Sequence, residues 1–238
     1  MSGLVKYESN EAIATLRMDD GKVNVMSTAM LKELHDAFDR AEREKSVVIL
    51  SGRENIFSAG FDLKTFASAN ANNIHEMVKL GAELTLRILT FPMPVIIACN
   101  GNALAMGSFL TLAADIRIGV DGPYKIGFNE VAIGIKVPGY AIGLASQRLS
   151  LAHFNRTAVT GELFTPLEAV RAGFLDHVVA SDALNSTAKT TALALTKINH
   201  AAHAVTKLRV RDAAIKAIRT DIDTEVTLEN YQKMVAPA

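Results

Sequence analysis

The segment 95–115 constrains the possible folds more than any other part of the chain. It begins with an apolar, largely β-branched run behind Pro94, which predicts a buried strand. A loop of small residues follows, and apolar residues at helical spacing then predict a helix. This order leaves unpaired backbone N–H groups at the helix start, next to the positive end of the helix dipole. Such groups suit an oxygen that becomes negative during a reaction, although many units of this kind serve structure alone.

The first half of the chain repeats this alternation of extended, turn and helical patterns. Strand-like composition is found at 11–18 and 47–50, and apolar residues at helical spacing begin after Ser27 and extend over 72–90. The alternation excludes an all-α and an all-β protein and predicts an α/β fold.

The second half changes character after about residue 181. The stretch 124–130 predicts a strand that ends at the carboxylate Glu130, and Thr165-Pro166-Leu167-Glu168 predicts a helix start with a capping box. Beyond Asp182 the pattern predicts three or so helices and no strand. We therefore divide the chain into a core at 1–181, which holds the site, and a helical region at 182–238, to which we assign oligomerisation.

Composition excludes several classes of function. The 238 residues include 25 Lys plus Arg and 25 Asp plus Glu, so no net charge attracts nucleic acid or an anionic membrane. Cys99 is the only cysteine, and no histidine pattern completes a metal site, so we expect neither a disulfide framework nor a metal. No apolar run approaches the roughly 20 residues of a membrane span, and no signal or transit pattern opens the chain. We expect a cytoplasmic protein.

Four motifs in order resemble the crotonase superfamily, the enoyl-CoA hydratase/isomerase family. They are Phe57-Ser58-Ala59-Gly60-Phe61-Asp62-Leu63, Asn100-Gly101 with Gly107, Gly127-Phe128-Asn129-Glu130 with Gly134, and Thr160-Gly161 with the segment 165–176. The resemblance covers roughly residues 5–235. It implies a spiral of ββα turns, followed by a C-terminal helical region that helps to assemble homotrimers or hexamers.

The resemblance also implies the chemistry and the site. Family members act on an acyl-CoA thioester, whose carbonyl becomes an enolate-like oxyanion held by two backbone N–H groups. The matching donors here are those of Phe61 and Met106. Coenzyme A is part of the substrate, so no separate cofactor is expected. The resemblance assigns substrate binding to Lys22, Val23, Ala59, Gly60, Asp62, Leu63, Gly107 and Phe109.

One departure from the hydratase pattern favours a particular reaction. Hydratases of the family carry a carboxylate three residues after the second donor, where this chain has Phe109, while Glu130 matches their other carboxylate. Moving a double bond from C3 to C2 needs a single base, whereas adding water needs a pair of acid/base groups. The chain thus most resembles the Δ3-Δ2-enoyl-CoA isomerases of fatty acid β-oxidation, and apolar surroundings are expected to raise the pKa of Glu130. A hydratase or another CoA-thioester lyase, and a non-catalytic CoA-binding scaffold, remain as alternatives.

Overall fold

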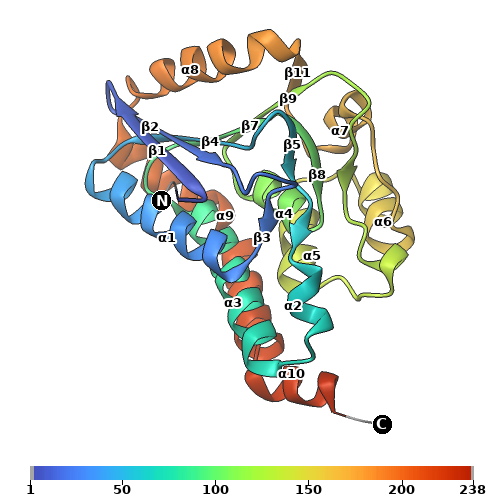
Figure 1. The fold of residues 1–238 in the computed structure, drawn as a ribbon. Coiled ribbons are helices and arrows are strands. Elements are labelled where there is room, and N and C mark those ends of the chain that lie inside the picture. The colour runs from blue at the N-terminus through green and yellow to red at the C-terminus, as the bar shows by residue number, and fades with distance from the viewer. Residues whose placement is uncertain (1–2, 237–238) are drawn as a thin grey trace.

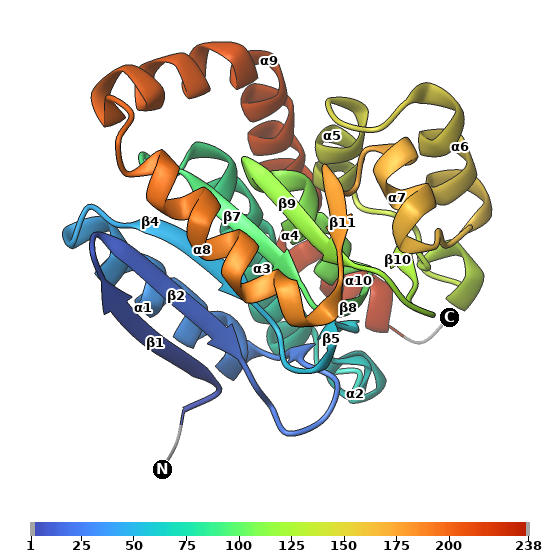
Figure 2. The same cartoon turned by 90° about the horizontal axis from the view of Figure 1, so that it is seen from above.

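A six-stranded sheet forms the centre of the computed structural model, which describes residues 3–236. Strand β1 is antiparallel to β2, and the other neighbouring strands are parallel. Figure 2 shows the strands side by side. In spatial order they are β1 (Val5–Asn10), β2 (Ile13–Met18), β4 (Val47–Ser51), β7 (Val95–Cys99), β9 (Ile116–Val120) and β11 (His177–Val179).

Shorter strands form two further sheets beside the first. One consists of β10 (Ile126–Gly127), β8 (Gly101–Leu104) and β5 (Asn55–Ser58), and the other of β3 (Val25–Met26) and β6 (Gly60–Phe61). The chain passes repeatedly from the large sheet to the second sheet and then into a helix. The shortest such turn is β7, β8 and α4 (Met106–Ala113). This is the α/β spiral of ββα turns expected from the sequence.

Alternating side chains on the parallel strands supply both faces of the large sheet with apolar groups, because successive residues of a strand point to opposite faces. Val48 and Leu50 of β4 belong to the main core, together with buried residues of α1 (Thr28–Arg43), α3 (Ala71–Thr90) and α4. Val47 and Ile49 belong to a second cluster, which α8 (Leu184–Leu195) covers. Figure 2 shows α8 lying over this face of the sheet.

The remaining helices surround the second sheet and the outer side of α3. After residue 182 the chain forms α8, α9 (His200–Glu225) and α10 (Leu228–Val235), in agreement with the expected helical region. Helix α9 packs on α3 and α5, and α10 packs on α3 (Figure 1). Among residues 3–236 no helix is long and apolar enough to span a membrane. The other elements are α2 (Leu63–Ala67), η1 (Val131–Ile133), α5 (Gly139–Ser146), α6 (Leu151–Thr160), α7 (Pro166–Ala172) and η2 (Ser181–Ala183).

The sequence-based strand over 124–130 is wrong in extent, since only Ile126–Gly127 is extended as β10. Gly127 has φ +144°, a conformation that interrupts a regular strand. The next N–H, that of Phe128, donates to the hydroxyl of Thr157 on α6 at 2.9 Å instead of to another strand. Glu130 therefore lies at the start of the 3₁₀ helix η1 and not at a strand end.

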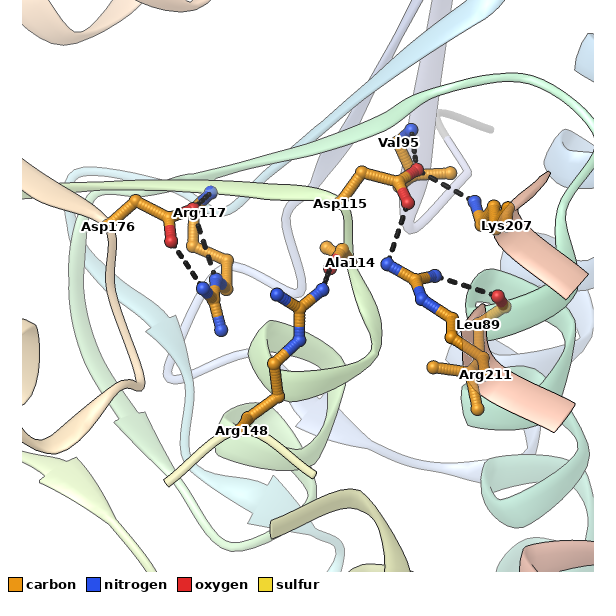
Figure 3. A network of polar contacts seen from close by, with 9 residues as sticks. All are labelled: Leu89, Val95, Ala114, Asp115, Arg117, Arg148, Asp176, Lys207 and Arg211. Carbon is orange, nitrogen blue, oxygen red and sulfur yellow. Dashed lines mark hydrogen bonds and ion pairs between the residues drawn. The ribbon is translucent and has the colours of Figure 1, made fainter. Parts of the chain in front are cut away.

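A buried ion cluster joins α9 to the large sheet (Figure 3). One carboxylate oxygen of Asp115 accepts from the Val95 N–H at 2.8 Å and from Lys207 Nζ at 2.7 Å. The other accepts from Arg211 at 2.8 Å, and Arg211 also donates to the carbonyl of Leu89 at 2.8 Å. Burial lowers the pKa of Lys207 to about 8 despite the adjacent Asp115. The cluster thus fixes α9 against the end of α3 and the start of β7.

Candidate active site

A largely apolar cavity of about 440 Å³ lies between the loop that carries β6, the start of α4, the η1 segment and the C-terminal helices. Its size and its few polar groups are typical of a small-molecule site. The lining residues are Ala59, Phe61, Leu63, Phe66, Val78, Ala105, Phe109, Asn129, Glu130, Ile133, Ile135, Lys136, Pro138, Tyr140, Glu225, Val226, Asn230, Tyr231 and Met234.

Two glycines allow the two motif loops to touch beside this cavity. Gly60 has φ +93°, and a Cβ atom placed on it would lie 2.7 Å from the Ala105 Cβ and 3.4 Å from the Met106 nitrogen. A Cβ atom on Gly107 would lie 2.7 Å from the Ser58 carbonyl oxygen. Both separations are too short for a real side chain. The sequence motifs therefore specify a close approach of two backbones.

Ala105 adopts a strained conformation directly before α4. Its φ of 48° and ψ of −124° lie in a region that a non-glycine residue rarely occupies, at a cost on the order of 1–3 kcal/mol. Met106 is the first residue of α4, so its N–H has no acceptor within the helix. Phe61 lies next to Gly60 in β6, on the other touching loop. Phe61 and Met106, whose N–H groups are expected to bind an oxyanion, thus directly follow Gly60 and Ala105, the two residues in contact.

Glu130 is buried and lacks a full set of hydrogen bonds. It is 6% exposed, and its Oε2 atom has no hydrogen-bond partner in the part of the chain that the structure describes. Burial raises the pKa of Glu130 to about 7, although backbone N–H groups at Asn129 and Glu130 oppose the shift. A carboxyl group with this pKa can both accept and return a proton near neutral pH.

Phe109 occupies the position at which hydratases of the family carry their other carboxylate. It is 1% exposed, and its ring lies edge-on to those of Phe128 and Tyr140, with centroids 4.8 Å and 5.9 Å away. Among the described residues, the carboxylates that line the cavity are Glu130 and Glu225. Glu225 accepts from the Gly139 N–H at 3.1 Å. The wall formed by α4 is therefore apolar.

The substrate-binding residues expected from the sequence fall into two groups. Ala59, Leu63 and Phe109 line the cavity, and Gly60 and Gly107 shape the contact beside it. The others lie outside the lining. The Val23 carbonyl accepts from the Ala59 N–H at 3.0 Å, which places the loop of Lys22 and Val23 against the motif loop. Asp62 caps α2 by accepting from the Lys64 N–H at 3.0 Å.

Sequence reasoning missed the wall formed by the C-terminal helices. Val226, Tyr231 and Met234 lie more than 90 residues beyond Glu130, yet they line the same cavity. Tyr140 was also missed, because the segment before it reads as irregular and α5 was not predicted. No local sequence signal connects these residues to the site, since tertiary packing alone brings them there. Within residues 3–236 no group of three or more His, Cys, Asp or Glu side chains is placed to hold a metal ion.

Comparison with known proteins identifies the class. The family described as enoyl-CoA hydratase/isomerase matches residues 8–235. Mitochondrial enoyl-CoA delta isomerase 1 of Mus musculus is 32% identical over 237 residues, which cover 98% of this chain and 81% of the relative. A probable enoyl-CoA hydratase of Bacillus subtilis is 35% identical over 143 residues, which cover 59% of this chain and 54% of that protein.

Solved structures agree with the sequence comparison. Human mitochondrial delta3-delta2-enoyl-CoA isomerase superposes with a TM-score of 0.91 at 30% identity, covering 98% of this chain and 92% of the other. The enoyl-CoA hydratase EchA3 of Mycobacterium ulcerans gives 0.91 at 39% identity, with 96% and 99% covered. The fold and the cavity thus define an α/β protein of the crotonase type. The chain belongs to the enoyl-CoA hydratase/isomerase family, whose members include both isomerases and hydratases by name.

Proposed function

We propose that the protein is a Δ3-Δ2-enoyl-CoA isomerase with Glu130 as its sole base. One observation carries this proposal. The cavity holds the buried carboxylate of Glu130, whose Oε2 atom has no hydrogen-bond partner among the described residues, and the α4 side of the cavity presents the apolar Phe109. Isomerisation needs one group that removes a proton and returns it elsewhere, whereas hydration needs a second group to hold and activate water.

The reaction begins with the thioester carbonyl oxygen near the N–H groups of Phe61 and Met106. Glu130 removes a proton from C2, and the C–H electron pair moves into the carbonyl to form an enolate. The enolate then takes the proton from Glu130 at C4, and the double bond moves from C3–C4 to C2–C3. A backbone donor aimed at the developing oxyanion contributes about 3–4 kcal/mol to lowering the barrier.

The binding roles follow from the places of the residues. The cavity beside Phe109 and Leu63 takes the acyl chain, because its lining is largely apolar. The loop of Lys22 and Val23 lies outside the cavity lining, next to the motif loop, as does the Asp62 side chain, and these groups bind the coenzyme A part of the substrate. In this scheme coenzyme A enters and leaves with the acyl group, so the reaction uses no separate cofactor.

A hydratase or related lyase is the second candidate. Relatives named as hydratases and the presence of Glu225 in the cavity wall support it. Glu225 lies on α9 and not on α4, and its carboxylate already accepts from the backbone of Gly139.

Ultraviolet absorbance distinguishes the candidates, because a double bond conjugated to the thioester absorbs and a hydrated or unconjugated chain does not. We expect purified protein to increase absorbance with 3-enoyl-CoA and to leave 2-enoyl-CoA nearly unchanged. Efficient loss of the 2-enoyl-CoA signal would instead establish hydration. Tight binding of both esters without turnover would indicate a non-catalytic scaffold.

We also propose that the protein assembles in threes through its C-terminal helical region. The exposed apolar side chains of Val205 and Leu208, three residues apart on one face of α9, support this, because water solvates such a face poorly. Light scattering should give a trimer or a hexamer at micromolar concentration, and a stable monomer would contradict the proposal.

A further inference from the structure

Tyr140 is a buried polar residue that the scheme above does not use. It is 1% exposed and lines the same cavity as Glu130. Its hydroxyl oxygen has no hydrogen-bond partner within residues 3–236, and neither has Glu130 Oε2. A buried hydroxyl without a partner is unfavourable, so phenylalanine would fill this space better if the ring alone mattered.

The surroundings of Tyr140 hold its hydroxyl in place. The residue lies in the first turn of α5, where Glu225 accepts from the Gly139 N–H at 3.1 Å. Its ring packs edge-on against Phe109, with centroids 5.9 Å apart. Burial, together with the nearby Tyr231 and Glu130, raises the pKa of the phenol well above its ordinary value. The hydroxyl is therefore a neutral and fixed hydrogen-bond donor at working pH.

We propose that Tyr140 is a positioning residue whose hydroxyl donates a hydrogen bond to the Glu130 carboxylate through one bridging water. A phenol suits this task because it can donate to a carboxylate and accept from a carboxylic acid. One group thus serves both protonation states of a base that takes and returns a proton. The role in taking and returning a proton rests on the proposed function, whereas the bridged hydrogen bond between Tyr140 and Glu130 does not.

Other groups around Glu130 are less suited to this role. Glu225 on α9 is an acceptor and is already bonded, and Tyr231 on α10 is only partly buried. Lys136, which follows η1, is exposed to solvent. Helix α6 packs against η1, and its Arg156 pairs with Glu162 just beyond the helix, so that the two charges neutralise each other in solvent. Tyr140 is the donor among them that is almost fully buried.

The substitution Tyr140→Phe tests the proposal, because it removes the hydroxyl and keeps the ring that packs on Phe109. Loss of a donor to the charged form should raise the pKa of Glu130 further. The acidic limb of the kcat profile should move up by about one pH unit, so that kcat falls about threefold to tenfold at pH 7 and recovers at higher pH. KM should change little.

Tyr124→Phe is the matched control, since the Tyr124 hydroxyl donates at 2.6 Å to Asn55, and Tyr124 is not among the residues that line the cavity. It should leave the pH profile unchanged. An infrared titration of the Glu130 carboxyl, with Glu130→Gln as the reference, gives a readout that needs no turnover. It therefore tests the contact even if the protein fails to isomerise enoyl-CoA.

A raised Glu130 pKa in Tyr140→Phe is the expected result. An unchanged or lowered Glu130 pKa in that variant overturns the proposal. Increased thermal stability without a shift of the titration also overturns it, because the hydroxyl would then be an unpaired group on a ring that only packs.

Discussion

Gly60 and Ala105 are in such close contact that a Cβ atom on Gly60 would lie only 2.7 Å from that of Ala105. The contact holds β6 against the start of α4, and the backbone N–H groups of Phe61 and Met106 lie on its two sides. The absence of a side chain on Gly60 and the methyl group of Ala105 therefore set the spacing of the two proposed oxyanion donors.

Gly60→Ala should separate these donors. The new methyl group would clash with Ala105 and also force an unfavourable φ of +93° on a non-glycine residue. We expect kcat to fall by about 10²-fold, the usual loss when one oxyanion donor is misplaced. Gly21→Ala is the control, because Gly21 has φ +75° but nothing within 4 Å of an added Cβ. It should cost about 1 kcal/mol of stability and leave kcat unchanged. Equal kcat losses in both variants would count against the donor geometry.

Glu130→Gln should separate binding from chemistry. The amide keeps the size of the side chain but cannot accept the C2 proton. Turnover should fall by roughly 10²–10⁴-fold, whereas affinity for the CoA ester should stay near that of the wild type. Steady-state kinetics and a ligand titration on one preparation measure both quantities. If turnover stays within about threefold of wild type, Glu130 is not the base.

The raised pKa of Glu130 predicts two pH effects. Activity should fall below about pH 7, because only the carboxylate can remove a proton.

Stability should instead fall as the pH rises. Between 4.5, the ordinary pKa, and about 7, the folded chain keeps a proton that the unfolded chain has released. The contribution of Glu130 to stability therefore decreases as pH rises through this window. Glu130→Gln lacks this titrating group. From pH 4 to pH 8, its free energy of unfolding should therefore rise by about 3 kcal/mol relative to that of the wild type, as measured by urea denaturation.

Phe109→Glu should not turn the protein into a hydratase. The substitution introduces a carboxylate at the hydratase position, but it buries a charge among aromatic rings. We expect a loss of about 3–5 kcal/mol of stability, comparable to the removal of a buried phenylalanine. Hydration of 2-enoyl-CoA should stay far below the wild-type isomerisation rate. Phe109→Leu serves as the uncharged control and should retain isomerisation. A stable, efficient hydratase would show that Phe109 alone decides between the two reactions.

The ion cluster at Asp115 offers a test of stability away from the cavity. Asp115→Ala would leave Lys207 and Arg211 buried without their carboxylate, which typically costs about 3–5 kcal/mol. Asp212→Ala breaks an exposed pair with Lys216 and should cost less than about 1 kcal/mol. Chemical denaturation of both variants compares the two losses. Similar values would mean that the Asp115 cluster contributes no more than a surface pair.

Local constraints explain which parts of the molecule were predictable. The capping box at Thr165 depends on residues within one helical turn, and the structure has it as expected. Gly60 and Gly107 belong to recognisable motifs, and the structure shows that they allow two distant loops to touch. The strand over 124–130 failed because Gly127 bends the chain and because Thr157, about 30 residues away, captures the next N–H. Tyr140 and Tyr231 reach the cavity only through the packing of α5, α9 and α10 on α3 and α4. Such contacts join segments that no local pattern connects.

The cavity wall draws on residues from Ala59 to Met234, and α10 supplies its last part. During synthesis, the nascent polypeptide can complete the spiral and still have a reaction chamber that is open to water on the side later covered by α10. Catalytic competence should therefore arrive late, in one step, when α10 docks on α3. Without α10 the cavity would lose the wall formed by Asn230, Tyr231 and Met234 and would be open to water on that side.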